Sequence, residues 1–237
     1  MNIKPFRLAH CLLFAASALV LGACATTQTG PTAADNAREV EALARRHPAP
    51  YDAKQVSDAA VLQAMRASFK DSPSARLDRL DQTPLQAACT EASRHGKALD
   101  PKVREQLQAA ALASVKYPAD GKYLGDWKRG EAIAQSGRGL QYSDPVGTIA
   151  GGNCYACHQV DKKEISFGNI GPTLWHYGKT RGQSEEIVKY TWARIWNSHA
   201  FNACANMPRF GDAGILNEAQ IKDVMALLLD PASPVNQ

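Results

Sequence analysis

The sequence Cys154-Tyr155-Ala156-Cys157-His158 decides how the chain is interpreted. Its C-x-x-C-H spacing is typical of the attachment of a c-type haem. Two thiols three positions apart can add to the two vinyl groups on one edge of a porphyrin, and the adjacent histidine then lies under the iron. The motif therefore predicts one covalent haem c, bound through Cys154 and Cys157, with His158 as an axial ligand of the iron.

Two other uses of a C-x-x-C pair fit this sequence less well. A thioredoxin-like pair is expected after a β-strand, whereas Gly151-Gly152-Asn153 precedes this one. A four-cysteine zinc site needs a second C-x-x-C pair, and the sequence has none.

The second axial ligand must come from elsewhere in the chain. Met207 lies in the irregular stretch 206–211, where a thioether can face the open side of the haem. Methionine ligation raises the reduction potential and closes the iron to substrate. Met65 and Met225 lie in helical patterns and are interpreted as core residues. His176, His199 and Cys204 remain as alternative ligands.

The loop that follows the haem motif contains Gly171-Pro172-Thr173-Leu174. The carbonyl oxygen of Pro172 could orient the His158 ring, as partners of iron-bound histidines commonly do; an ordinary turn is the alternative. Four basic residues could flank the exposed haem edge and steer an acidic partner, or could simply be solvated: Lys162, Lys163, Lys179 and Arg181.

The N-terminus is typical of an export signal. Two basic residues precede a short apolar run at 11–21, and Leu21-Gly22-Ala23-Cys24 has the form of a bacterial lipobox. We expect residues 1–23 to be a lipoprotein signal peptide and Cys24 to be lipidated, with ordinary cleavage nearby as the alternative. Small, polar residues at 25–37 suit a flexible tether, which we expect to cover residues 24–49. The mature chain is then periplasmic and anchored to a membrane, with a weak indication for the outer membrane.

Net charge and the remaining cysteines narrow the choice of partners. The formal net charge is +4, and no basic tract or aromatic-interleaved patch occurs, so nucleic acid is not expected as a partner. Cys89 and Cys204 are left over in an oxidising compartment, which favours a disulfide between them. Two unrelated thiols, or one with a redox role, are the alternative.

The periodicity of apolar residues predicts an all-α chain, and no strand is indicated. A helical N-terminal extension over 50–116 precedes a haem domain over 117–237. Asp126 and the pair Asn217/Gln220 are predicted helix caps. The expected helices cover residues 54–69, 74–81, 83–93, 101–115, 126–137, 184–198 and 218–229.

From about Tyr117 to its end the chain resembles SoxX, the monohaem subunit of the SoxAX cytochromes of bacterial sulfur oxidation. The matching segments, in order, are Tyr117-Pro118-Ala119-Asp120-Gly121, Gly125-Asp126-Trp127, residues 152–159, Gly168-Asn169-Ile170-Gly171-Pro172, Met207-Pro208-Arg209-Phe210-Gly211 and Asp230-Pro231-Ala232-Ser233-Pro234-Val235-Asn236. The lipobox departs from an exported soluble SoxX.

The resemblance implies a class I cytochrome c fold with His158/Met207 ligation. It also implies a heterodimer with a SoxA-like subunit that conjugates thiosulfate to a cysteine of the carrier protein SoxYZ, an L-cysteine S-thiosulfotransferase. This chain would be its non-catalytic subunit, passing electrons to a small cytochrome c, with no active centre of its own.

Two other functions remain open from the sequence. The chain could be a stand-alone, membrane-tethered cytochrome c without sulfur chemistry. As a weaker alternative, the chain could itself be catalytic, with Cys204 or a haem iron that has a free axial position as its active centre.

Overall fold

The computed structural model of the chain describes Arg38 and residues 56–237. The signal peptide, Cys24 and the tether at 24–49 lie outside the described residues, as does the start of the helix expected at 54–69. Within the described residues, no helix combines the length and the apolar character needed to cross a membrane.

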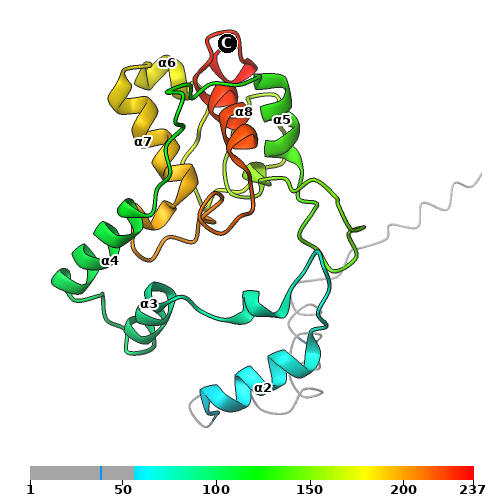
Figure 1. Cartoon of the computed structure of the whole chain (residues 1–237), viewed down its shortest axis with the longest axis vertical. Coiled ribbons are helices and arrows are strands. Elements are labelled where there is room, and N and C mark those ends of the chain that lie inside the picture. Colours follow the sequence, from blue (N-terminus) through cyan, green and yellow to red (C-terminus); the bar gives the residue numbers. More distant parts are fainter. Residues whose placement is uncertain (1–37, 39–55) are drawn as a thin grey trace, which may run out of the picture. The chain divides into compact units, whose positions relative to one another are not determined.

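The described part of the chain is helical and contains no strand, as the sequence predicts. The α-helices are α2 (Asp58–Ser68), α3 (Pro84–Arg94), α4 (Pro101–Ala113), α5 (Trp127–Gln135), α6 (Tyr177–Arg181), α7 (Glu185–Trp196) and α8 (Glu218–Leu229). Short 3-10 helices are η2 (Leu77–Leu80), η3 (Cys154–Ala156), η4 (Ser198–Ala200) and η5 (Pro234–Asn236). The order of the α-helices along the chain can be followed in Figure 1.

The helix ends follow from their capping residues. The side chain of Asn217 accepts from Gln220 N at 2.9 Å, and Gln220 Oε1 accepts from Asn217 N at 3.1 Å, which forms the predicted capping box of α8. Asp126 caps α5 as expected, since its carboxylate accepts from Lys128 N at 2.8 Å. Each such cap satisfies backbone N–H groups that have no partner within their helix.

Two local predictions are wrong. Only η2 forms within 74–81, because Asp71 and Ser72 offer side-chain oxygens to Leu77 N and Ala75 N and so favour a turn over a helix. Conversely, α6 forms in a segment expected to be loop. Its Gly178 lies against the backbone of α8, so close that a Cβ there would meet Leu228 O at 2.9 Å.

The pairing of α5 with α8 organises the haem-motif half of the chain (Figure 1). Gly130 allows the close approach, because a Cβ at this position would overlap the Asp223 carbonyl of α8. The buried Asp223 carboxylate accepts from Arg129 Nε at 2.8 Å, from Arg129 Nη2 at 2.9 Å and from Asp126 N at 2.7 Å. This one side chain therefore fixes the start of α5 against α8.

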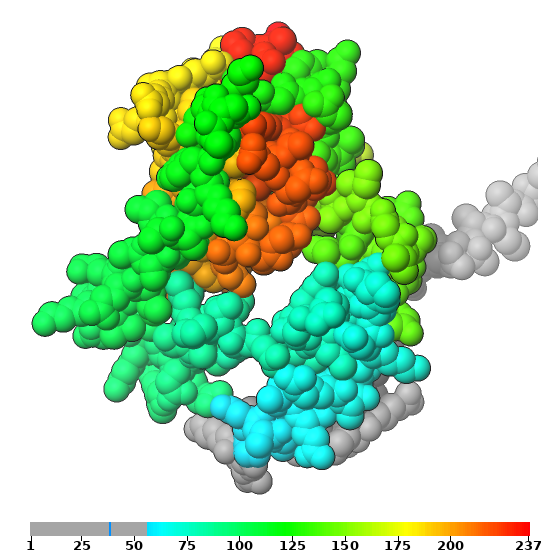
Figure 2. Space-filling model, viewed as in Figure 1, coloured from blue at the N-terminus to red at the C-terminus, as the bar shows by residue number. Residues whose placement is uncertain are grey.

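The C-terminal helix α8 forms the centre of the core. Eight of its residues are buried, and Figure 2 shows its orange surface between green segments that precede α7 in the chain. Met225 is fully buried, which agrees with its predicted core role. Trp192 is also fully buried and stacks on Trp196 at 6.1 Å between ring centroids, so both tryptophans of α7 serve packing.

The helices of the N-terminal extension differ in how closely they pack against the rest of the chain. In α4, the carbonyl of Ala111 and the hydroxyl of Ser114 lie near the Asn197 amide, which donates to Ser114 Oγ at 3.0 Å. By contrast, no residue of α2 is buried, so the core role expected for Met65 is wrong. Val61 and Leu62 of α2 are exposed and Met65 is only partly buried.

Candidate functional site

A cavity of about 530 Å³ brings the haem motif and Met207 together. Cys154, Cys157 and His158 line it along with Met207. Its remaining walls are largely apolar and come from three helices, α5, α7 and α8, through residues such as Ala134, Ile195, Val224, Leu227 and Leu228. Its size and its apolar walls are those of a site for a large planar cofactor.

The motif is held by its own backbone and by the loop that follows. Asn153 has a left-handed backbone (φ 46°) and starts η3, and His158 N then donates to Cys154 O at 2.9 Å. Gly171 N donates to Cys157 O at 2.8 Å, which brings residues 168–174 alongside the motif. This turn places both cysteines and the histidine on the same cavity.

The His158 ring has a defined orientation, with Nδ1 as the donor. Its Nδ1 lies 2.6 Å from Pro172 O. A carbonyl oxygen can only accept, so Nδ1 carries the hydrogen and Nε2 is left with a free lone pair for a metal. Gly171 lies so close to the ring that a Cβ would overlap it. The structure thus places Pro172 where the sequence expected it.

Both motif thiols are free to form thioethers. Burial raises the pKa of the Cys154 thiol to about 12, so its side chain is uncharged at neutral pH. An uncharged sulfur in an apolar wall matches a thioether bond, whereas a zinc thiolate would carry charge. No group of three or more His, Cys, Asp or Glu side chains suited to a metal ion occurs in the described residues. The donor set therefore fits a covalent haem.

Met207 reaches the cavity through a loop that runs from η4 to Gly211. Ser198 Oγ donates to Met207 O at 2.6 Å, and Phe210 N donates to Ile195 O at 3.2 Å. Gly211 lies against the Trp196 ring, where a larger residue would not fit. The loop is thus attached to α7 and η4 on both sides of the methionine.

The alternative axial ligands are not available in this arrangement. Of the four histidines within residues 56–237, His158 alone lines the cavity. His176 Nε2 is occupied by Gln237 O at 2.6 Å, and His199 Nε2 by Ala205 O at 3.2 Å. Burial lowers the pKa of His199, which favours its neutral form. Cys204 forms a disulfide with Cys89, so it offers no thiolate.

Charged and polar residues that the sequence did not single out also line the cavity. Tyr190, Arg194, Asn202 and Asn206 do so, together with Arg181. The Arg194 guanidinium donates to Ser198 O at 3.1 Å. Arg181 and Arg194 could hold the carboxylates of a haem. Of the four basic residues considered from the sequence, Arg181 alone lines the cavity, and Lys162 lies over the Trp175 ring instead.

Comparison with known proteins supports this description of the site. Residues 143–230 match the family model for cytochrome c. A relative from Aquifex aeolicus (strain VF5), described as an uncharacterized lipoprotein, is 42% identical over 128 residues. That match covers 53% of this chain and 59% of the relative, so the chain spans about three fifths of the relative's length.

Residues 143–230 therefore match a cytochrome c domain, in a chain whose described part is all-α. A domain of this family implies a covalent haem c and a role in electron transfer.

Proposed function

We propose that this chain is the electron-transfer subunit of a SoxAX-type enzyme, which couples thiosulfate oxidatively to a cysteine of the carrier protein SoxYZ. The observation that carries the proposal is the shared cavity. Cys154, Cys157, His158 and Met207 line it, a donor set that would leave a bound haem no open position for a substrate. Such a site suits a relay, and its sulfur specificity rests on the resemblance to SoxX.

The residues around the cavity each favour electron transfer over substrate chemistry. A haem held here supplies reversible one-electron reduction. Pro172 fixes His158 in the tautomer that leaves Nε2 free. Met207 would complete the ligand set of such a haem, raise its potential and leave no open position for a substrate. The walls that α5, α7 and α8 contribute are largely apolar.

The stoichiometry of the reaction explains why such a chain needs partners. Joining a carrier thiolate, R–S⁻, to S₂O₃²⁻ forms R–S–S–SO₃⁻ and releases two electrons. One haem accepts one electron at a time, so a SoxA-like subunit with the reactive centre must carry out the bond-forming step. A small cytochrome c is then the acceptor to which this chain passes electrons.

Exposed apolar residues in the loops before and after the haem motif are consistent with a protein partner. Ile170 lines the cavity and is 72% exposed. Val146, Ile149 and Ile165, in the loops before and after the motif, are at least 77% exposed. Exposed apolar side chains of this kind commonly mark protein–protein contacts. We assign this region to docking of the SoxA-like subunit.

A lipid anchor at Cys24 would hold the complex at a membrane on the periplasmic side. The lipobox supports the anchor, and the Aquifex aeolicus relative is itself described as a lipoprotein. The same feature favours the second candidate function, a stand-alone tethered cytochrome c that serves another donor.

The test is a reduction assay with the mature holoprotein. The haem Soret and α bands are followed after thiosulfate and carrier protein are added, with and without a SoxA-like subunit. A carrier whose thiol has been alkylated is the matched control. Reduction that needs both the partner and the free carrier thiol supports the proposal. Reduction of this chain alone would place the active centre here, and reduction in neither mixture would favour the stand-alone carrier.

A further inference from the structure

We infer that the Cys89–Cys204 disulfide is a positioning element for the Met207 ligand. It joins α3 of the N-terminal extension to the ligand loop, defined as residues 201–211, and holds that loop closed over the haem cavity. The inference rests on the proposed ligation of the haem iron by Met207. It gives the extension, which carries no redox group, a part in electron transfer.

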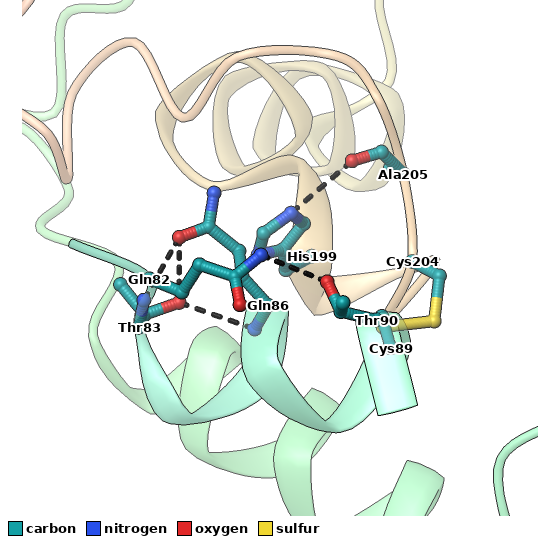
Figure 3. Close-up of a disulfide and its surroundings, with 8 residues drawn as sticks. All are labelled: Gln82, Thr83, Gln86, Cys89, Thr90, His199, Cys204 and Ala205. Carbon is teal, nitrogen blue, oxygen red and sulfur yellow. Dashed lines mark hydrogen bonds between the residues drawn. A yellow bond between two sulfur atoms is a disulfide. The ribbon is translucent and has the colours of Figure 1, made fainter. Parts of the chain in front are cut away.

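The bridge lies close to the ligand. Cys204 is three residues before Met207, and both line the same cavity. The bridged Cα atoms are 5.6 Å apart, although 115 residues separate them in sequence. Figure 3 shows the bridge leaving α3 and meeting the ligand loop beside His199 and Ala205. A displacement of Cys204 is therefore transmitted to Met207 over a very short length of backbone.

The contact between α3 and the ligand loop is otherwise loose. A second cavity of about 410 Å³ lies between them, lined by Leu85 and Gln86 on one side and by residues 203–209 on the other. The polar side chains of α3 bond among themselves: Gln86 N donates to Thr83 Oγ1, and Gln82 Nε2 donates to Thr90 Oγ1. In the described residues, no hydrogen bond joins α3 to the ligand loop. The covalent bridge is therefore the main connection between them.

Apart from the bridge, the ligand loop is held by backbone bonds from Phe210 and Gly211 to α7 and by a few bonds to η4. Ser198 Oγ donates to Met207 O at 2.6 Å, and His199 Nε2 donates to Ala205 O at 3.2 Å. Ala203 and Phe210 are buried, but Asn202, Cys204 and Asn206 are exposed, so burial holds the loop at only some of its positions. Single hydrogen bonds of this kind contribute only modestly to stability. Without the bridge, we expect the loop to open more often and to withdraw Met207.

The experiment measures how often Met207 leaves the iron. Cyanide is mixed with the ferric holoprotein, and its binding rate reports loop opening, since cyanide needs the position that the methionine holds. We expect Cys89→Ser/Cys204→Ser to bind cyanide about tenfold faster or more, at the lower end of the effects seen when partners of metal ligands are lost. The far-red methionine–ferric iron absorption should weaken in parallel.

A control separates positioning from general stability. Asn217→Ala removes the cap of α8, which should lower overall stability, and the Asn217 side chain pairs with Gln220 rather than with the ligand loop. Its cyanide rate should stay close to that of the wild type. If the two variants speed cyanide binding equally, the bridge acts only through stability and the inference is wrong.

A second measurement uses the wild-type protein, so it does not depend on whether the double variant folds. Folded wild-type holoprotein is treated anaerobically with dithiothreitol, alkylated, and reoxidised with ferricyanide; mass spectrometry counts the two adducts. Faster cyanide binding after alkylation supports the inference, and an unchanged rate overturns it. Alkylation of both thiols without any reductant would show that the bridge does not form. A wild-type protein lacking the methionine–iron absorption would instead refute the proposed ligation itself.

Discussion

Gly171→Ala tests the geometry that orients the iron-binding histidine. The new methyl group would overlap the Cε1, Nδ1 and Nε2 atoms of the His158 ring. Because Gly171 is tied to the motif by its bond to Cys157 O, the backbone has little room to retreat. The ring must therefore move, and its 2.6 Å hydrogen bond to Pro172 O must lengthen or break.

Two costs determine the size of the effect. Forcing an extra methyl into a packed site costs about 1 to 3 kcal/mol. Loss of the Nδ1–H···O hydrogen bond adds about 1 kcal/mol. We therefore expect Gly171→Ala to lower the free energy of unfolding by about 2 to 4 kcal/mol. Loss of the bond to Pro172 also makes the imidazole a weaker electron donor, so the midpoint potential should rise.

The assay is chemical denaturation of the ferric holoprotein, followed by circular dichroism and the Soret band, together with a redox titration. Gly137→Ala is the matched control, because a Cβ there meets nothing closer than the Asn153 side-chain amide at 3.2 Å. It should change stability by less than about 1 kcal/mol. Wild-type stability and an unchanged potential in Gly171→Ala would refute the orientation described for His158.

Three further predictions concern the rest of the fold. Asp223→Asn should destabilise the protein by about 1 to 3 kcal/mol in urea unfolding, because Arg129 loses the charge of its buried partner; an unchanged midpoint would contradict the role given to this pair. His199 has a lowered pKa in the fold, so its contribution is present above about pH 6.5 and is lost as the pH falls below that value; His199→Gln should remove this part of the pH dependence of unfolding, and parallel profiles would count against it. Arg94→Ala breaks an exposed pair with Asp58 and should change stability by less than about 0.5 kcal/mol, whereas a loss above about 2 kcal/mol would show that α2 is held more strongly than its exposure indicates.

Local chemistry made much of the fold predictable from sequence. The start of α8 was found because Asn217 and Gln220 satisfy each other's backbone within four residues. The motif 154–158 specified its own site, since the spacing of the thiols and the histidine is set by a single turn. Pro172 could be proposed because a histidine ligand needs an acceptor and the loop after the motif supplies one.

Interactions between distant parts of the chain were not predictable in this way. The sequence did not single out Asp223, and nothing local shows that Arg129, on another helix, binds it. Arg194 lines the cavity on a helix whose sequence indicates ordinary packing. For Cys89 and Cys204 the sequence left a disulfide and two separate thiols open, and the structure pairs them.

Exposure of the ferrous holoprotein to carbon monoxide tests the central claim most directly. If His158 and Met207 occupy both axial positions of the iron, the wild-type spectrum should not change, whereas Met207→Ala should bind carbon monoxide readily. Binding by the wild type as rapid as by Met207→Ala would contradict the account, because the iron would then be open and the chain could not be a closed electron relay.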